Sequence, residues 1–366
     1  MSVLIYGDTV RSPTLRHEVP VAIGDPFLYL ESNGTRAVTA NALERPRLEA
    51  AGDLQVIGLE ELGWDELIKS GRPRWDIEFE VAARAVERLG LRAADVPAEF
   101  PVALADRLRE RGIEVRAAHE EFSRRRRVKS SAEMAGVRRA QAAADAAMAR
   151  AAEMLRGGGS LTSEVVRNEM IAICRSHGAT LPADVIVASG AAGAVGHDPG
   201  SGPLGEGEPI IIDIWPVDDE SACYADMTRT FVVGQISDEL AEWHALTKEA
   251  LERTREAVRP GAHGREIYDI ACEVYEKAGI PTQRTKAEGE VLRDGFFHGL
   301  GHGVGLDVHE DPGLGRSGDE LLTGDVITLE PGTYRQGYGG VRLEDLVLVT
   351  EDGGETLTNF PYELTP

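Results

Sequence analysis

The sequence predicts a two-domain protein of mixed α/β class, whose C-terminal domain consists of two similar halves. Three observations lead to this prediction. The chain has 366 residues, more than a single hydrophobic core usually organises. Short apolar runs typical of strands alternate with helical patterns along its length. A strand, turn and strand pattern also occurs twice in the second half of the chain, and each copy carries two carboxylates.

The first part of the chain has the pattern of a small α/β domain. Residues 20–60 alternate short apolar runs with turn residues, and the Asn-Gly pair at 33–34 is typical of a tight hairpin. Residues 76–90 and 101–112 instead have apolar positions three and four apart, and each segment ends at a glycine suited to a helix C-terminus. We therefore expect a mixed domain of strands and helices over residues 1–125.

A long helix is predicted to open the second domain, which we expect to span residues 126–366. Residues 131–156 are rich in alanine, with Ser130 or Ser131 as the N-cap and a run of glycines as the stop. Two more helical patterns follow within this domain, at 162–177 and 237–278.

Four acidic residues occupy matched positions in the two repeated hairpins. Asp213 lies near the end of the run PIIIDIW, and Asp226 follows thirteen positions later in a second strand. Glu330 ends the run DVITLE, and Glu344 follows fourteen positions later in a second strand. A single acid at a strand end is usually solvated or salt-bridged, but a carboxylate buried among Ile, Leu and Val needs a cationic partner. Four in matched hairpins predict a cation site between the two halves.

Histidines follow in the segment GFFHGLGHGVGLDVHE, which contains His298, His302 and His309. In an extended chain His298 and His302 project to the same face. A strand histidine is more often a core residue, but beside four carboxylates we expect at least one to bind metal. Carboxylates and imidazole without thiolate suit manganese, cobalt, iron or zinc. Two such ions would polarise a carbonyl and activate a shared water, which predicts hydrolysis. A calcium site would instead use closely spaced acids in one loop.

Composition and charge exclude several classes of protein. The hydrophobic share of 42% and charged share of 28% are typical of soluble globular proteins. A formal net charge of -23 disfavours nucleic acid and anionic membranes as partners. The N-terminal residues contain no signal-peptide pattern, so a cytoplasmic protein is expected. The basic run at 124–127 is expected to be a linker or helix entry, and Cys174, Cys223 and Cys272 to be reduced core residues.

Several motifs together resemble those of the pita-bread metallopeptidases, in particular the proline-directed branch of aminopeptidase P and prolidase. The motifs are DMTRT, HGLGHGVGLDVHE, LEPGTY and VRLEDLVLV. The resemblance implies a pseudo-symmetric pita-bread catalytic domain preceded by a smaller α/β domain of creatinase type. It also implies a homodimer that cleaves Xaa-Pro bonds in peptides with proline at the second position.

The resemblance further implies two divalent ions, with manganese in first place and cobalt, zinc or iron as alternatives. Asp226 and Glu344 would bridge both ions and Asp213 would bind one of them. His302 and Glu330 would complete the other. Glu330 would also carry a proton from a metal-bridging hydroxide to the leaving nitrogen.

Four more residues correspond to substrate-facing positions of the family. His197 would face the substrate, and His309 would steady the tetrahedral intermediate. His298 and Arg342 would contact the proline side or the carboxylate of the substrate. Arg342 has an alternative role, because it lies two residues from Glu344 and could simply neutralise the acidic cluster.

Other functions remain as alternatives. A methionine aminopeptidase would normally lack the large N-terminal domain and the arginine at position 342. A creatinase-like enzyme, which cuts a C–N bond without metal, would not need all five ligands. An inactive binding relative would have lost a ligand. The gap from Asp213 to Asp226 and the segment 282–295 are longer than usual for the family, which leaves open a preference for dipeptides or longer peptides.

Overall fold

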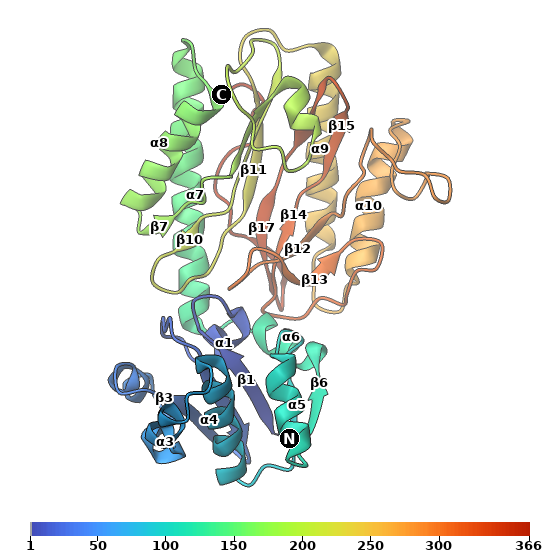
Figure 1. The fold of residues 1–366 in the computed structure, drawn as a ribbon. Helices are drawn as coiled ribbons and strands as arrows, with labels where there is room; N and C mark the ends of the chain where they lie inside the picture. Colours follow the sequence, from blue (N-terminus) through green and yellow to red (C-terminus); the bar gives the residue numbers. More distant parts are fainter. Residues whose placement is uncertain (1) are drawn as a thin grey trace. The chain divides into compact units, whose positions relative to one another are not determined.

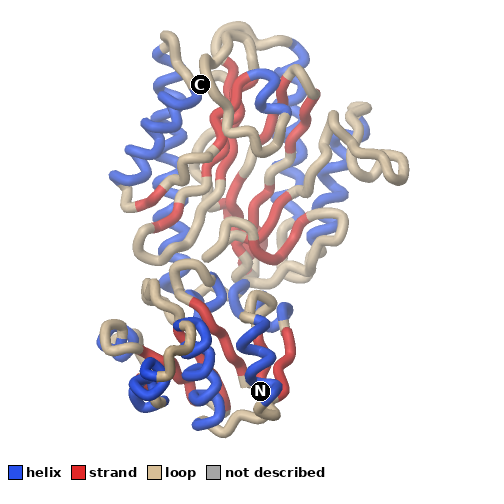
Figure 2. Tube along the Cα trace, viewed as in Figure 1, coloured by secondary structure: helices blue, strands red, loops and turns tan. Residues whose placement is uncertain are grey.

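The computed structural model describes residues 2–366 and divides the chain after Arg126 into two compact units. Helices and strands are interleaved along both units (Figures 1 and 2). The predicted mixed α/β class is therefore confirmed. Within residues 2–366, no helix combines the length and apolarity needed to cross a membrane.

The N-terminal unit contains one six-stranded sheet in the order β4-β3-β2-β1-β5-β6. The hairpin predicted at 33–34 joins β2 to β3: Ser32 pairs with Thr35, and both turn residues have positive φ. The strands are β1 (Val3–Gly7), β2 (Phe27–Ser32), β3 (Thr35–Ala40), β4 (Gln55–Gly58), β5 (Ala93–Val96) and β6 (Glu114–Ala117).

The two helices predicted in this unit are confirmed as α4 (Arg74–Arg88) and α5 (Val102–Glu110). Gly90 and Gly112 follow them with positive φ, as expected for helix C-termini. Their buried apolar faces pack on the sheet in one core cluster. The other α-helices of this part of the chain are α1 (Pro13–Glu18), α2 (Arg45–Glu49), α3 (Trp64–Lys69) and α6 (His119–Arg127).

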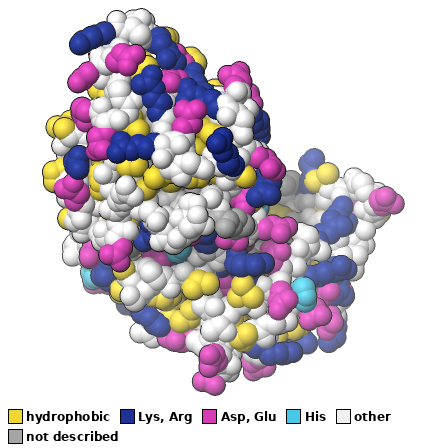
Figure 3. Space-filling view, turned by 90° about the horizontal axis from the view of Figure 1, so that it is seen from below, with side chains coloured by type: hydrophobic (Ala, Val, Ile, Leu, Met, Phe, Trp, Pro, Cys, Tyr) yellow, Lys and Arg dark blue, Asp and Glu magenta, His cyan; other side chains and the backbone are white. Residues whose placement is uncertain are grey.

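The basic run at 124–127 forms the end of α6. Arg125 makes ion pairs with Glu18 and Glu31, and Arg127 pairs with the buried Asp325 at 2.6 Å. Basic and acidic side chains are interspersed on the face shown in Figure 3. The run therefore contributes paired arginines to the fold.

Four long helices frame the C-terminal unit. Ser130 caps α7 (Ser131–Gly157) in a capping box with Glu133, which confirms the predicted start of this helix. In Figure 1, α7 and α8 lie on one side of the strands, and α9 and α10 on the other. The helical pattern at 237–278 is thus two helices separated by a short break. Their bounds are α8 (Ser163–Ser176), α9 (Asp238–Ala257) and α10 (Gly264–Lys277).

The strands of this unit form two main antiparallel sheets, one for each half. The first has the order β11-β9-β8 and shares a core with α7 and α8. The second has the order β13-β12-β14-β17-β18 and shares a core with α9 and α10. Their bounds are β8 (Ile186–Ser189), β9 (Pro209–Ile214), β11 (Met227–Val232), β12 (Gly301–Gly303), β13 (Glu310–Leu314), β14 (Val326–Leu329), β17 (Asp345–Thr350) and β18 (Gly353–Thr356).

Two short ribbons complete the unit. One pairs β15 (Gly332–Arg335) with β16 (Gly339–Arg342), and the other pairs β7 (Ala179–Thr180) with β10 (Val217–Asp218). The three cysteines are free and buried, as predicted.

Two acids expected inside strands lie just outside them, and this part of the prediction was wrong. Asp226 immediately precedes β11, and Glu344 lies in the break between β16 and β17. The break occurs because the chain changes partners there: β16 pairs with β15, whereas β17 pairs with β14. The Glu344 amide donates to the Thr228 carbonyl at 3.0 Å, which joins the two halves at this point. His298 also lies outside a strand, in the segment before β12.

Arg229 holds this junction from behind. Its fully buried guanidinium donates to the carbonyls of Thr228 and Glu344 at 2.9 and 2.7 Å, and to the Asp345 carboxylate at 3.0 Å. It also donates to the carbonyls of Phe360 and Pro361, which ties the C-terminal segment to the same point. One side chain therefore fixes the backbone on both sides of Glu344.

We expect Arg229→Met to lower the free energy of unfolding by about 3–5 kcal/mol, because it leaves Asp345 as a buried carboxylate without its main partner. Urea unfolding followed by circular dichroism would measure this loss. Arg253→Met is the control, since Arg253 lies on α9 with a partly exposed side chain and should change stability by less than about 0.5 kcal/mol. Equal losses in both variants would contradict the structural role given to Arg229.

Candidate metal centre

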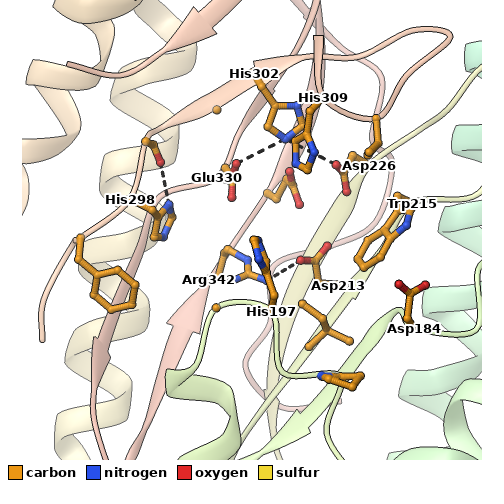
Figure 4. A pocket seen from close by; sticks show the side chains of 18 residues that line it. Asp184, His197, Asp213, Trp215, Asp226, His298, His302, His309, Glu330 and Arg342 are labelled. Carbon is orange, nitrogen blue, oxygen red and sulfur yellow. Dashed lines mark hydrogen bonds and ion pairs between the residues drawn. The ribbon is translucent and has the colours of Figure 1, made fainter. Parts of the chain in front are cut away.

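A pocket of about 650 Å³ in the C-terminal unit brings together every site residue predicted from the sequence (Figure 4). These residues come from both halves of the unit, although they are spread over nearly 150 positions of the chain. They are His197, Asp213, Asp226, His298, His302, His309, Glu330, Arg342 and Glu344.

The acids surround the His302 ring. Its Nε2 lies 3.6 Å from Glu330 Oε1 and 3.8 Å from Asp226 Oδ2. One side-chain atom each from Asp226, His302 and Glu344 lies within 4.8 Å of the others. Asp213 enters from β9, where it pairs with Ile186 on one side and Thr228 on the other. The arrangement is compact enough for shared cations.

Burial and mutual repulsion disfavour the charged forms of these acids. Burial raises the pKa of Asp226, and the nearby Glu344 and Asp213 carboxylates raise it further. Burial and neighbouring carboxylates also raise the pKa of Glu344. Burial chiefly raises the pKa of Glu330 to about 8, although Arg342 opposes the shift. A divalent cation among them would remove this penalty.

His302 presents a lone pair to the same space. Burial lowers the pKa of His302 to about 4, so the ring is neutral at physiological pH. Its Nδ1 lies 3.1 Å from the Gly303 carbonyl, which can only accept, so Nδ1 carries the proton. The unprotonated Nε2 therefore faces Asp226 and Glu330, as in a metal-binding histidine whose other nitrogen is held by the backbone.

An unsatisfied oxygen of Asp213 also fits a metal ion. Asp213 Oδ2 accepts from Arg342 Nη2 at 2.5 Å, whereas Oδ1 is buried and has no hydrogen-bond partner among residues 2–366. Buried carboxylate oxygens normally have partners. The donor set of four carboxylates and a neutral imidazole suits hard or borderline divalent ions.

Arg342 is held firmly by the protein. Besides Asp213, its guanidinium donates from Nε to Thr228 Oγ1 at 3.2 Å and from Nη1 to the Tyr334 hydroxyl at 3.0 Å. Only 5% of the residue is exposed, yet it lines the pocket. These bonds use three of its five N–H groups, so the same side chain can orient Asp213 and still offer donors to a ligand.

The Tyr334 hydroxyl links Arg342 to His298. Because it accepts from Arg342, it donates its proton to His298 Nε2 at 3.0 Å. His298 Nδ1 lies 2.7 Å from the Gly299 carbonyl and so donates to it. Both ring nitrogens are therefore occupied, and His298 can meet a ligand only with its ring. Phe297 packs beside this ring and also lines the pocket.

The remaining two histidines are exposed at the pocket. His309 lies in the loop between β12 and β13, with its ring 4.3 Å from that of His302 between centroids. His197 lies in the loop between β8 and β9. Both line the pocket beside the acids (Figure 4).

Besides Phe297, sequence reasoning gave no role to four residues that the structure places at the site. Thr228 donates to Glu344 Oε2 at 2.7 Å, and its position two residues after Asp226 could have indicated a shared face. Tyr334 is the last residue of the quoted motif LEPGTY, within which only Glu330 was given a role. Asp184 and Trp215 line the pocket, and nothing in their local sequence indicated this.

The two unusually long segments are anchored away from the acids. In the turn after Asp213, β10 pairs with β7, and Asp218 accepts from Arg139 at 2.8 Å. Between Asp213 and Asp226, Trp215 alone among the described residues lines the pocket. Segment 282–295 contributes no lining residue within the described chain, although it leads directly to Phe297.

Comparison with known proteins points to one family. The model of metallopeptidase family M24 matches residues 135–351. The probable dipeptidase PepE of Mycobacterium tuberculosis is 34% identical over 271 residues, which cover 74% of this chain and 68% of PepE. The Xaa-Pro dipeptidase of Pyrococcus horikoshii is 31% identical over 296 residues, or 78% of this chain and 77% of that protein.

Solved structures support the same relationship. The Xaa-Pro dipeptidase from Bacillus anthracis superposes with a TM-score of 0.82 and 25% identity, over 99% of this chain and 94% of that chain. The prolidase from Pyrococcus horikoshii superposes with a TM-score of 0.80 and 25% identity, over 99% and 95% of the two chains.

We expect Tyr334→Phe to lower the free energy of unfolding by about 1–3 kcal/mol, because it removes a buried hydrogen-bond partner from both Arg342 and His298. Urea unfolding would measure the change. Tyr338→Phe is the control, since the Tyr338 hydroxyl makes only an exposed 3.4 Å contact with Ser237. A loss no larger than in the control would show that the Tyr334 link contributes nothing.

Proposed function

Because the chain belongs to metallopeptidase family M24, whose members use divalent metal ions, we propose that it hydrolyses Xaa-Pro peptide bonds as a dipeptidase or an aminopeptidase. The observation that carries the proposal is the convergence of four carboxylates and the free Nε2 of His302 in one pocket. The names of its relatives support the choice of an Xaa-Pro bond.

The proposed cofactor is a pair of divalent ions, with manganese first and cobalt, zinc or iron as alternatives. Asp226 and Glu344 would bridge the pair and Asp213 would bind one ion, for which its unpartnered Oδ1 is available. His302 and Glu330 would complete the other. Such a pair would polarise the scissile carbonyl and lower the pKa of a shared water.

The side chains of the pocket supply the remaining chemistry. Glu330 lies 3.6 Å from His302 among the acids, and it would accept a proton from the attacking water and return it to the proline nitrogen. His309 and His197, both exposed at the pocket, would donate to the substrate carbonyl as charge develops on its oxygen.

The side of the pocket that contains His298 and Phe297 would orient the substrate. The His298 ring and Phe297 offer an aromatic wall suited to the apolar proline ring. The unused N–H groups of Arg342 would bind the substrate carboxylate. The two roles considered for Arg342 are thus compatible, since it holds Asp213 with one edge and faces the pocket with another.

We also propose that the protein is a cytoplasmic homodimer, with residues 1–125 as the N-terminal domain and 126–366 as the catalytic domain. The motif resemblance supports the dimer, and the division of the chain after Arg126 is compatible with the boundary. Light scattering on the purified protein would test the dimer.

A cleavage panel on the metal-loaded protein tests the proposed reaction. Xaa-Pro dipeptides, longer Xaa-Pro-Yaa peptides, Met-Ala-Ser and creatine would be compared under the same conditions. We expect turnover of the proline peptides alone, and the first two groups would distinguish a dipeptidase from an aminopeptidase. Cleavage of Met-Ala-Ser or creatine instead, or no bound metal and no gain on adding manganese or cobalt, would overturn the proposal.

We expect Asp226→Asn to lower Xaa-Pro hydrolysis by more than about 100-fold while the fold stays intact, because it removes a bridging carboxylate. Turnover, bound metal and circular dichroism would be measured together. Asp219→Asn is the control, since Asp219 lies in the exposed turn after β10. Substantial residual activity in Asp226→Asn would show that the proposed ligand set is wrong.

We expect Arg342→Ala to lower kcat/KM for Xaa-Pro dipeptides about 30-fold, because the substrate carboxylate loses a charged partner. Bound metal should remain, because the loss of the Arg342 guanidinium makes the cluster of acids more negative and so strengthens its attraction for a divalent ion. Elemental analysis beside kinetics would check both points. Arg335→Ala, which affects a partly exposed pair with Glu239, is the control. If metal content fell as far as activity, Arg342 would serve to neutralise the acidic cluster and would not bind the substrate carboxylate.

A further inference from the structure

The pocket continues beyond the acids along β8 and β9. The register of these strands pairs Ile186 with Asp213. Continued two residues outward, the same register sets Asp184 opposite Trp215, on the same face of the strands because side chains alternate. All four residues line the pocket. Figure 4 shows Asp184 beside Trp215, on the side of the pocket away from His298.

The Asp184 carboxylate is available to a ligand. It is exposed, it lines the pocket, and within residues 2–366 it makes no hydrogen bond or ion pair. Two other acids of this half are engaged, because Asp213 pairs with Arg342 and Asp218 pairs with Arg139. Trp215 is half-buried and adds an aromatic surface beside Asp184.

We propose that Asp184 and Trp215 form a subsite for a positively charged side chain on the first residue of the substrate, which makes Lys-Pro and Arg-Pro peptides preferred substrates. The inference rests on the proposed Xaa-Pro hydrolysis and specifies the identity of Xaa. The aliphatic stem packs on Trp215, and the cation pairs with Asp184.

The dimensions of the strands fit this ligand. Trp215 lies two positions after Asp213, a rise of about 7 Å in an extended chain. The substrate α-ammonium group is one bond from the carbon next to the scissile carbonyl, so it stays beside the metal-site acids. Only a long side chain on the first residue reaches Asp184.

Charge also sets the direction in which the peptide lies. A substrate carboxylate placed beside Asp184 would be repelled, whereas Arg342 lies on the His298 side of Asp184 and attracts it. The proline end therefore lies toward His298 and the first residue toward Asp184. The net charge of -23 favours the approach of a cationic peptide as well.

The experiment measures a selectivity ratio, the kcat/KM for Lys-Pro divided by that for norleucine-Pro, in the metal-loaded protein. Norleucine keeps the length of the lysine stem and lacks its charge. We expect a ratio of roughly 3 to 10 in the wild type, as for a partly exposed charge pair. Asp184→Asn should bring the ratio close to one, and Asp184→Lys should bring it below one.

Asp352→Asn is the matched control, because it removes the same charge from an exposed aspartate in the turn between β17 and β18. It should keep the wild-type ratio. A wild-type ratio near one, or a ratio that Asp184→Asn leaves unchanged, would overturn the subsite.

A binding measurement separates this proposal from the proposed reaction. Calorimetry would compare uncleavable Lys-Pro and norleucine-Pro analogues, with a methylene in place of the scissile carbonyl, on the wild type and the three variants. Tighter binding of the Lys analogue that depends on Asp184 would support the subsite even if no Xaa-Pro bond were cut. Equal binding of both analogues to the wild type would overturn it, whatever the protein hydrolyses.

Discussion

Repulsion among buried carboxylates is the constraint on which the rest of this structure depends. Asp213, Asp226, Glu330 and Glu344 share one pocket, and burial together with mutual repulsion raises the pKa of three of them. Arg342 offsets only part of this charge, because it bonds to a single carboxylate, that of Asp213. Such a cluster needs cations to stabilise it. Metal binding should therefore stabilise the folded C-terminal unit.

The supports behind the acids explain how the two halves of the unit hold them in place. Each half brings a sheet and a pair of helices, and the halves meet where the Glu344 amide bonds to the Thr228 carbonyl. Arg229 fixes the backbone at this junction from the far side, and the Thr228 hydroxyl holds the Glu344 carboxylate from the near side. The position of Glu344 is therefore set by contacts from both halves, which gives the acids a rigid frame.

A chain of hydrogen bonds connects the acids to the aromatic side of the pocket. Asp213 bonds to Arg342, Arg342 to Tyr334, and Tyr334 to His298. The proposed metal site and the proposed proline wall are thus parts of one buried network, in which each member depends on the orientation of the next. The side of the pocket away from His298 lacks such a network among the described residues. There Asp184 is exposed and without a partner in the described chain, as suits a group that selects among substrates rather than one that holds the fold.

The sequence by itself determined the mixed α/β class, the main helices, the repeated hairpins and the set of residues that share the pocket. It could do so because the spacing of apolar residues, the helix caps and the acids at the ends of apolar runs are visible in short segments of the sequence. The joint occurrence of motifs such as DMTRT and VRLEDLVLV then indicated which of these residues share a site. Only the tertiary structure decided that Asp226 and Glu344 lie outside strands. At Glu344 the reason is a change of partner strand, which leaves no local signal. The tertiary structure alone also brought Asp184 opposite Trp215, because strand register depends on pairing between segments that are distant in the chain.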